Sequence, residues 1–212
     1  EHALKTPTLL GDLVKQGDLV LLITPIDTEA PEGRLILPQV QAIRDIIDKD
    51  AIAIVVKERE IDTFLGRSSI KPVLAITDSQ VFVKADASVP PDIPLTSFSI
   101  ALARLKGDFD AYLRGTPEIS KLEDGNRVLL LESCSHHVAC DDIGRIKIPR
   151  WISNFTGKKL HFDVVAGLDA TPRPVTDYSL VIQCGGCMIT RKQLNNRLKP
   201  AIEAGIPVTN YG

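Results

Sequence analysis

Short apolar runs alternate along the chain with segments in which apolar residues recur every three or four positions. These runs predict strands, and those over residues 19–23 and 51–56 are continuously apolar, as in strands that are covered on both faces of a parallel sheet. They span residues 19–23, 51–56, 73–76, 127–132, 160–165, 178–182 and 206–209. The other segments, which predict helices, span residues 36–47, 61–65, 98–112, 151–155 and 194–202. Strands and helices in alternation predict an α/β fold with mostly parallel sheets flanked by helices.

Residues with strong positional preferences predict where several helices begin and end. Pro38 suits the first turn of the helix over 36–47, because the N–H groups of that turn have no partner within the helix. Gly66, Gly157 and Gly205 follow other helical segments and are expected to close them, since glycine tolerates a left-handed conformation. Residues 77–79, Thr-Asp-Ser, offer an N-cap for one more helix.

The strongest interruption of the pattern lies at residues 89–94, where three prolines fall within five positions. Proline continues neither a helix nor a central strand, so Leu95 and Thr96 form at most a short edge strand. We therefore expect two α/β units, residues 1–94 and residues 95–212. The first unit is expected to dimerise, because its apolar strands can extend a sheet across a two-fold axis. The alternative is that these strands are simply interior.

Composition removes several classes of function. The chain has 212 residues, of which 44% are hydrophobic and 25% charged, as in an ordinary globular protein. Its net charge of -2 provides no overall field for nucleic acid or an anionic membrane. No apolar run is long enough to span a bilayer. The sequence begins at Glu1 and its only methionine is Met188, so we expect a processed chain or an excised fragment.

Four cysteines, Cys134, Cys140, Cys184 and Cys187, all lie in the second half of the chain. This clustering differs from the even spacing of a secreted disulfide scaffold, so we expect a metal or redox site in a reducing compartment, the cytoplasm. Cys134 and Cys184 each come just after a predicted strand. Parallel strands bring their carboxyl ends to one edge of a sheet. If the two strands are neighbours, Cys134, His136, Cys184 and Cys187 should therefore converge.

The spacing of Cys184 and Cys187 lets a tight turn direct both sulfurs to one centre, and Gly185 and Gly186 permit the backbone angles of that turn. Four interpretations remain open. They are buried structural cysteines, a thiol oxidoreductase using the pair, a zinc-binding structural or interaction domain, and an iron–sulfur cluster held by three thiolates. Thiolates suit both metals, so the residues alone do not choose between zinc and iron. Candidates for a fourth ligand are His136, His137, Cys140, Asp141, Asp142 and an exogenous group.

Motifs for nucleotide binding and for nucleophilic catalysis are absent. The sequence contains neither Gly-x-x-x-x-Gly-Lys-Ser/Thr nor Gly-x-Gly-x-x-Gly, and no set of nucleophile, histidine and acid stands out. A small basic cluster of Arg145, Lys147 and Arg150 follows the cysteine segment. We expect it to be a solvent-exposed face, and the alternative is a contact with an anionic cluster or partner.

Around the cysteines the sequence resembles the FeFe-hydrogenase maturation GTPases, the HydF family of scaffold maturases. That family carries Cys-x-His and, about 46–53 residues later, His-Cys-x-x-Cys, a spacing suited to metal ligation. Here Cys134-Ser135-His136 is followed after 46 residues by Gln183-Cys184 and then by Cys187. Further similar segments span residues 24–31, 37–41, 141–145, 148–151 and 207–212.

The resemblance implies a dimerisation domain over residues 1–94 and an iron–sulfur domain over residues 95–212. It implies that the family's GTP-binding domain is not part of these residues, so we do not expect them to hydrolyse GTP. The implied partners are a second copy of the chain, apo FeFe-hydrogenase, and the radical maturation enzymes. In this role the protein receives a precursor of the di-iron subcluster and delivers it for H-cluster assembly, with no nucleic acid or membrane involved.

The resemblance also implies a cofactor, a 4Fe-4S cluster with one exchangeable coordination position. The implied ligands are Cys134, Cys184 and Cys187, with His136 or Asp141 in the fourth position. Gln183 departs from the histidine that is common in the family, and a glutamine side chain is a poor ligand for iron. A cluster that is held by three thiolates can accept a guest ligand and release it, which suits a scaffold.

Overall fold

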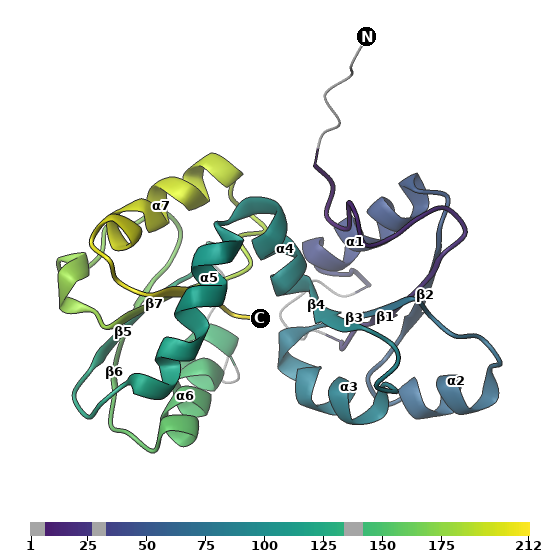
Figure 1. Cartoon of the computed structure of the whole chain (residues 1–212), viewed down its shortest axis with the longest axis horizontal. Helices are drawn as coiled ribbons and strands as arrows, with labels where there is room; N and C mark the ends of the chain where they lie inside the picture. Colours follow the sequence, from purple (N-terminus) through teal and green to yellow (C-terminus); the bar gives the residue numbers. More distant parts are fainter. Residues whose placement is uncertain (1–6, 27–32, 134–141) are drawn as a thin grey trace, which may run out of the picture. The chain divides into compact units, whose positions relative to one another are not determined.

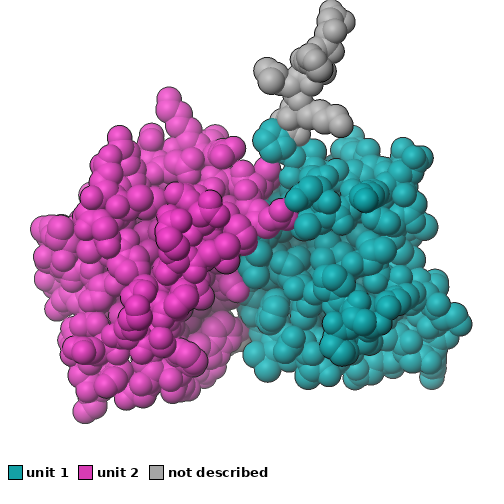
Figure 2. All heavy atoms as spheres, in the orientation of Figure 1, with its two compact units in different colours: residues 1–101 teal, residues 102–212 magenta. Residues whose placement is uncertain are grey.

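The computed structural model describes residues 7–26, 33–133 and 142–212. The chain forms two compact units, which divide between Ala101 and Leu102 (Figure 2). Each unit contains an all-parallel sheet of four strands with helices on its faces (Figure 1). The predicted α/β class with mostly parallel sheets is therefore confirmed. No helix in the described ranges combines the length and the apolarity that crossing a membrane requires.

The first unit has the strand order β2–β1–β3–β4. Its strands are β1 (Leu19–Ile23), β2 (Ile52–Val56), β3 (Leu74–Thr77) and β4 (Leu95–Ser97). Its helices are α1 (Leu37–Asp48), α2 (Ile61–Arg67) and α3 (Phe82–Ser88), with the 3-10 turn η1 (Ser79–Val81) before α3. One core cluster joins Leu21, Ile23 and Ala75 of the sheet to Ile61 of α2 and Ala85 of α3. Helix α1 covers the other face of this sheet (Figure 1).

The second unit repeats this topology with the order β6–β5–β7–β8. Its strands are β5 (Arg127–Leu131), β6 (His161–Val165), β7 (Leu180–Gln183) and β8 (Val208–Asn210). Its α-helices are α5 (Phe109–Gly115), α6 (Ile148–Thr156) and α7 (Arg191–Glu203). Shorter turns are η2 (Thr116–Lys121), the π-helical η3 (Ile143–Lys147) and η4 (Val175–Asp177). Helix α4 (Phe98–Lys106) spans the division between the units.

Strand β5 shows why an apolar run with no polar face folds as a central strand. Leu129 and Leu131 pack in a cluster with residues of α5 and α7, whereas Val128 and Leu130 pack with residues of α6. Successive side chains of a strand point to opposite faces, so both faces must be apolar when helices cover both. Packing on both faces therefore fixes the position of the carboxyl end of β5, from which Glu132 and Ser133 follow.

Several predicted element ends are confirmed. Pro38 lies in the first turn of α1, and the side chain of Asp78 caps η1 by accepting the N–H of Gln80. Gly157 and Gly205 have φ angles of 68° and 72°, so both use the left-handed conformation that ends α6 and α7. Strand β4 is an edge strand, as residues 95 and 96 predict.

Three predictions about elements are wrong. The single helix over 98–112 is two helices, because α4 ends at Lys106 and Asp108 caps the new helix α5 by accepting the N–H of Ala111. Gly66 lies inside α2, which ends one residue later where Ser68 is extended. The run over 51–56 is not covered on both faces, because β2 is at the edge of its sheet and Ile52 and Val55 are 53% and 45% exposed.

Candidate functional site

The two strands that precede the cysteine segments are parallel neighbours. Strand β5 pairs with β7, and Leu131 lies opposite Gln183 at their carboxyl ends. Strand β6 lies on the other side of β5, so the chain changes direction across the sheet between β5 and β7. Ligands of open α/β sheets bind beside such a switch point, at the carboxyl ends of the strands. The two strands are thus neighbours, which is the condition for the convergence of the segments that follow them.

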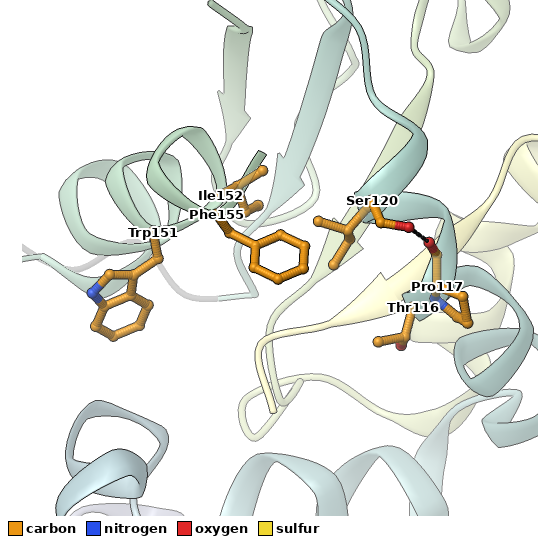
Figure 3. Close-up of a pocket in the computed structure, with 7 residues that line it drawn as sticks. Thr116, Pro117, Ser120, Trp151, Ile152 and Phe155 are labelled. Atoms are coloured by element: carbon orange, nitrogen blue, oxygen red, sulfur yellow. Dashed lines mark hydrogen bonds between the residues drawn. The ribbon is translucent and has the colours of Figure 1, made fainter. Parts of the chain in front are cut away.

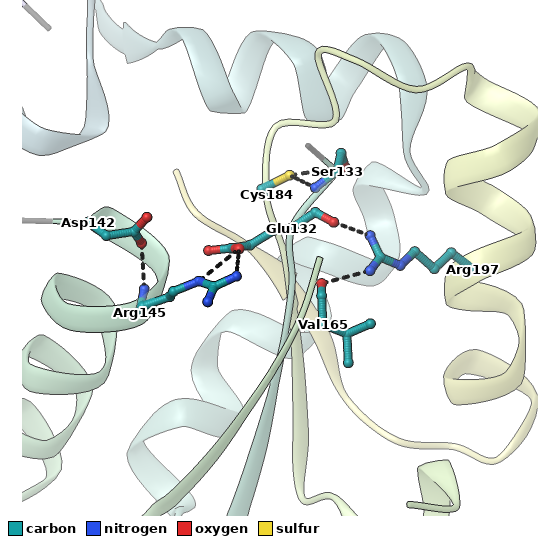
Figure 4. A network of polar contacts seen from close by, with 7 residues as sticks. All are labelled: Glu132, Ser133, Asp142, Arg145, Val165, Cys184 and Arg197. Carbon is teal, nitrogen blue, oxygen red and sulfur yellow. Dashed lines mark hydrogen bonds and ion pairs between the residues drawn. The ribbon is translucent and has the colours of Figure 1, made fainter. Parts of the chain in front are cut away.

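The sulfur of Cys184 lies among hydrogen-bonding groups from two segments of the chain, and Figure 4 shows its contact with Ser133. The backbone N–H of Ser133 donates to Sγ at 3.1 Å, and the backbone N–H of Gly186 donates at 3.4 Å. The side-chain amide of Gln183 adds a third N–H donor at 3.3 Å. Ser133 Oγ lies 3.1 Å from the same sulfur. Three N–H groups therefore converge on this one sulfur.

Gln183 has a role that the sequence does not indicate. Its side chain is fully buried, and Nε2 donates to Ser133 Oγ at 2.9 Å as well as to Cys184. The amide thus fixes the position of Ser133 and Cys184 relative to each other. The sequence identifies Gln183 only as a poor metal ligand, whereas the structure makes it a hydrogen-bond donor to a cysteine sulfur.

Cys187 is the second cysteine of the site and is a partly buried free thiol, as is Cys184. Burial raises the pKa of the Cys187 thiol, and the charge of Cys184 raises it further. The ammonium of Lys106 and the backbone N–H groups of Cys187 and Met188 act in the opposite direction. Lys106 was missed by sequence reasoning, because 80 or more residues separate it from the carbonyl groups that it binds.

The carboxyl end of β5 is held by two arginines (Figure 4). The guanidinium of Arg197 on α7 donates to the carbonyl oxygens of Glu132 at 2.6 Å and Val165 at 2.8 Å. Arg145 of η3 donates through Nε and Nη2 to one carboxylate oxygen of Glu132, both at 3.3 Å. The Glu132 carboxylate is 3% exposed, and buried charges of this kind are paired in stable proteins. A charged residue at the end of an apolar strand was the only sequence signal for this pair.

The expectation that residues 145, 147 and 150 form one solvent-exposed face is wrong for Arg145. Its guanidinium pairs with buried Glu132, and its backbone N–H donates to Asp142 Oδ1 at 2.8 Å. Asp142 is the N-cap of η3, and its side chain is buried. Gly144 in the same turn packs so closely that a Cβ atom there would overlap Glu132 and Tyr211.

The structure describes the positions of two of the predicted ligands. Cys184 and Cys187 lie together in the loop after β7. Cys134, His136, His137, Cys140 and Asp141 lie outside the described residues, so their place in the site stays a prediction. Within the ranges that the structure describes, no three His, Cys, Asp or Glu side chains form a group that could hold a metal ion.

Two family models match consecutive parts of the chain. Residues 9–107 match the hydrogen maturase F dimerization domain, and residues 110–212 match the hydrogen maturase F tetramerization domain. No curated protein matches the sequence.

Solved structures of several unrelated functions share some similarity with the chain. Ligand-free aspartate transcarbamoylase from Trypanosoma cruzi has 9% identity and a TM-score of 0.31 over 80% of this chain, which spans 62% of the length of that enzyme. An NtrC family transcriptional regulator from Clostridium acetobutylicum has 14% identity and a TM-score of 0.29, with 92% of this chain and 88% of that chain covered. A periplasmic solute-binding protein of an ABC transporter from Actinobacillus succinogenes has 13% identity and a TM-score of 0.28, with coverage of 92% and 77%.

Proposed function

The chain belongs to the hydrogen maturase F family, and from this premise we propose that it is a scaffold for cluster assembly on FeFe-hydrogenase. Family membership supports a role in hydrogenase maturation. The proposal adds that the second unit holds a 4Fe-4S cluster and a precursor of the di-iron subcluster. The precursor is received from the radical maturation enzymes and delivered to the apo-hydrogenase.

The surroundings of Cys184 are the observation that carries the proposal. Three N–H groups donate to its sulfur, from Ser133, Gln183 and Gly186. Hydrogen bonds of this kind stabilise a ligating thiolate and tune the potential of an iron–sulfur cluster. Ser133 is also the residue that immediately precedes Cys134 in the sequence. The chemistry of these residues therefore fits an iron–sulfur cluster.

The proposed ligands are Cys134, Cys184 and Cys187, with His136 or Asp141 in the fourth position. When bound, a cluster of this kind supplies one iron whose non-cysteine ligand can be exchanged. The protein's own contribution is positional. Gln183 and Ser133 fix Cys184, and Arg197 holds the ends of β5 and β6 so that the loop after β5 leaves the sheet at a defined point.

A thiol oxidoreductase is less well supported. An attacking thiol needs a pKa near or below neutral pH, because the thiolate is the nucleophile. The net effect of the surroundings raises the pKa of Cys187, with burial as the largest cause, which argues against Cys187 as the attacking thiol. A structural zinc ion uses the same donor set and is therefore the outcome that an experiment must separate from the cluster.

Self-association is also supported by family membership, and we propose that β2 forms the contact in the first unit. Ile52 and Val55 on this edge strand are about half exposed. The N–H of Ile52 donates toward β1, so the alternate residues 53 and 55 direct their N–H groups away from it. An apolar edge with outward N–H groups can pair with its copy across a two-fold axis and continue the sheet.

For the second unit we propose that an apolar groove between α6 and η2 receives another copy of the chain (Figure 3). The groove has a volume of about 430 Å³ and is lined mainly by Pro117, Ile119, Trp151, Ile152 and Phe155. Phe155 is 72% exposed and Trp151 is 39% exposed. The match of these residues to a tetramerization domain supports a second copy of the chain as the occupant. The groove and the aromatic side chains share one face. Each of two copies can therefore insert its Phe155 ring into the groove of the other.

Anaerobic reconstitution with iron and sulfide tests the proposed cofactor. The proposal predicts a brown protein with the broad visible absorption of an iron–sulfur cluster, and loss of that absorption in Cys187→Ala. A colourless protein that retains one tightly bound zinc ion under the same conditions would contradict it. Transfer of the di-iron precursor is tested by mixing the loaded protein with apo-hydrogenase and measuring hydrogen evolution.

A further inference from the structure

Lys106, the last residue of α4, binds the loop that carries both described cysteines. Its Nζ donates to the carbonyl oxygens of Gly186 at 2.8 Å, Cys187 at 3.2 Å and Ile189 at 2.9 Å. A lysine ammonium has three N–H donors, so this loop satisfies all of them. Three charge-assisted hydrogen bonds to one short segment hold that segment in one conformation.

The end of α4 is itself firmly placed. Gly107 follows Lys106, and its N–H donates to the carbonyl oxygen of Ala103 at 2.9 Å. A Cβ atom on Gly107 would overlap the ring of Tyr112, which is buried in the core of the second unit. Because helix end and aromatic ring are packed this closely, the lysine stem starts from a fixed point. The ammonium therefore reaches the loop from a backbone position that is already ordered.

The hydrogen bonds of Lys106 have a consequence for Cys187. In a trans peptide the C=O and N–H groups point in opposite directions. The carbonyls of Gly186 and Cys187 belong to the same peptides as the N–H groups of Cys187 and Met188. When Lys106 binds these carbonyls, the N–H groups face away from it. Lys106 therefore sets the orientation of both peptides that flank Cys187.

We propose that Lys106 is a positioning residue for the cluster site, because its hydrogen bonds set the two peptides that flank Cys187 and place a positive charge against this loop. This inference rests on the proposed function. It adds that the loop is shaped by a cation of the protein before any metal arrives. It also adds that this positive charge would stabilise the reduced state of a bound cluster, since a reduced cluster carries more negative charge than an oxidised one.

The test compares Lys106→Met with Lys106→Arg, which retains the charge. The matched control is Lys192→Met, which removes an exposed lysine near the start of α7. In the metal-free protein, hydrogen exchange is measured at the amides of Gly186 and Ile189, which donate within the loop. We expect roughly tenfold or faster exchange in Lys106→Met, an intermediate rate in Lys106→Arg, and the wild-type rate in the control. Wild-type exchange in Lys106→Met would overturn the inference.

A second readout uses the reconstituted protein. The cluster of Lys106→Met should have a more negative reduction potential than that of the wild type, and Lys106→Arg should restore most of the difference. Equal potentials in wild type and Lys106→Met would overturn the charge effect. If the wild type takes up no cluster, the proposed function fails, and hydrogen exchange still decides whether Lys106 shapes the loop. Should Lys106→Met fail to fold, Lys106→Gln replaces it, because it retains donors without the charge.

Discussion

The backbone N–H of Ser133 donates to the sulfur of Cys184 at 3.1 Å, although the two residues are 51 positions apart in the sequence. This contact exists because β5 and β7 end side by side, so the first residues after each strand meet at one edge of the sheet. The sulfur of Cys184 therefore lies beside the carboxyl ends of both β5 and β7. Changes to either loop are expected to alter the same site.

Replacing Gln183 by leucine should retain the cluster but move its reduction potential to a more negative value. The substitution removes an N–H donor to Cys184, and N–H donors stabilise the more negative reduced state. An anaerobic redox titration monitored by electron paramagnetic resonance measures the change. Thr209→Val is the matched control. It removes a buried hydroxyl from β8 of the same sheet, where Thr209 pairs with Thr116 of η2. An unchanged potential in Gln183→Leu would show that this amide does not act on the sulfur.

A charge on the β2 edge should break the contact proposed for the first unit. We expect Val55→Lys to reduce the oligomer by a factor of two in mass, because two lysines would face each other across the axis. Sedimentation equilibrium measures the mass. Val83→Lys serves as control, since Val83 on α3 is 86% exposed and lies outside the sheet. If Val55→Lys retains the wild-type mass, β2 is not the contact.

Phe155→Glu should remove the larger assembly and leave the dimer intact. The exposed ring would lose its apolar groove on the other copy, and burial of a phenylalanine side chain contributes about 1.5–3 kcal/mol. Two reciprocal contacts double the effect. Leu113→Glu, at an exposed position on α5, controls for the added charge. Persistence of tetramers in Phe155→Glu would rule out this groove, whereas a wild type that forms no tetramer would rule out tetramerisation itself.

Tyr178 gives the protein a defined loss of stability at high pH. Burial, together with a 2.8 Å hydrogen bond from Oη to Asp163, raises the pKa of Tyr178 to about 12. An unfolded tyrosine has a pKa of about 10, so the folded state binds more protons between these values. The contribution of Tyr178 is complete below pH 10 and is lost as the pH rises through 12.

Urea unfolding of the wild type and Tyr178→Phe checks this sign. The difference in free energy of unfolding between them should shrink by roughly 1–2 kcal/mol from pH 9.5 to pH 11.5. A difference that stays constant over this range would mean that Tyr178 titrates normally in the folded protein. Other groups that titrate at high pH are common to both proteins and cancel in the comparison.

The sequence is most informative where local chemistry decides the structure. The run at 127–131 becomes β5 because neither face is polar, and Gly157 ends α6 because it takes a left-handed conformation. Strand and helix alternation predicts that β5 and β7 are parallel, which is confirmed, whereas their pairing as neighbours is seen only in the structure. The break between α4 and α5 also has a local signal, Gly107-Asp108, in which Asp108 is the N-cap.

The parts that sequence reasoning missed depend on contacts between distant segments. No spacing rule connects Lys106 with Gly186 or Arg197 with Glu132, because these pairs form only when helices pack at the edge of the sheet. The exposure of β2 depends on strand order, which an apolar run does not reveal. The role of Gln183 could not be predicted either, because its amide donates to Ser133 and Cys184 only once the two strand ends lie side by side.

Iron and sulfide analysis with electron paramagnetic resonance on anaerobically reconstituted protein tests the central claim most directly, when wild type is compared with Cys184→Ala and Cys140→Ala. The account predicts about four irons and four sulfides per chain in the wild type and in Cys140→Ala, which removes a cysteine outside the proposed ligand set. It predicts loss of the cluster signal in Cys184→Ala. A full complement of iron and an unchanged signal in Cys184→Ala would contradict it.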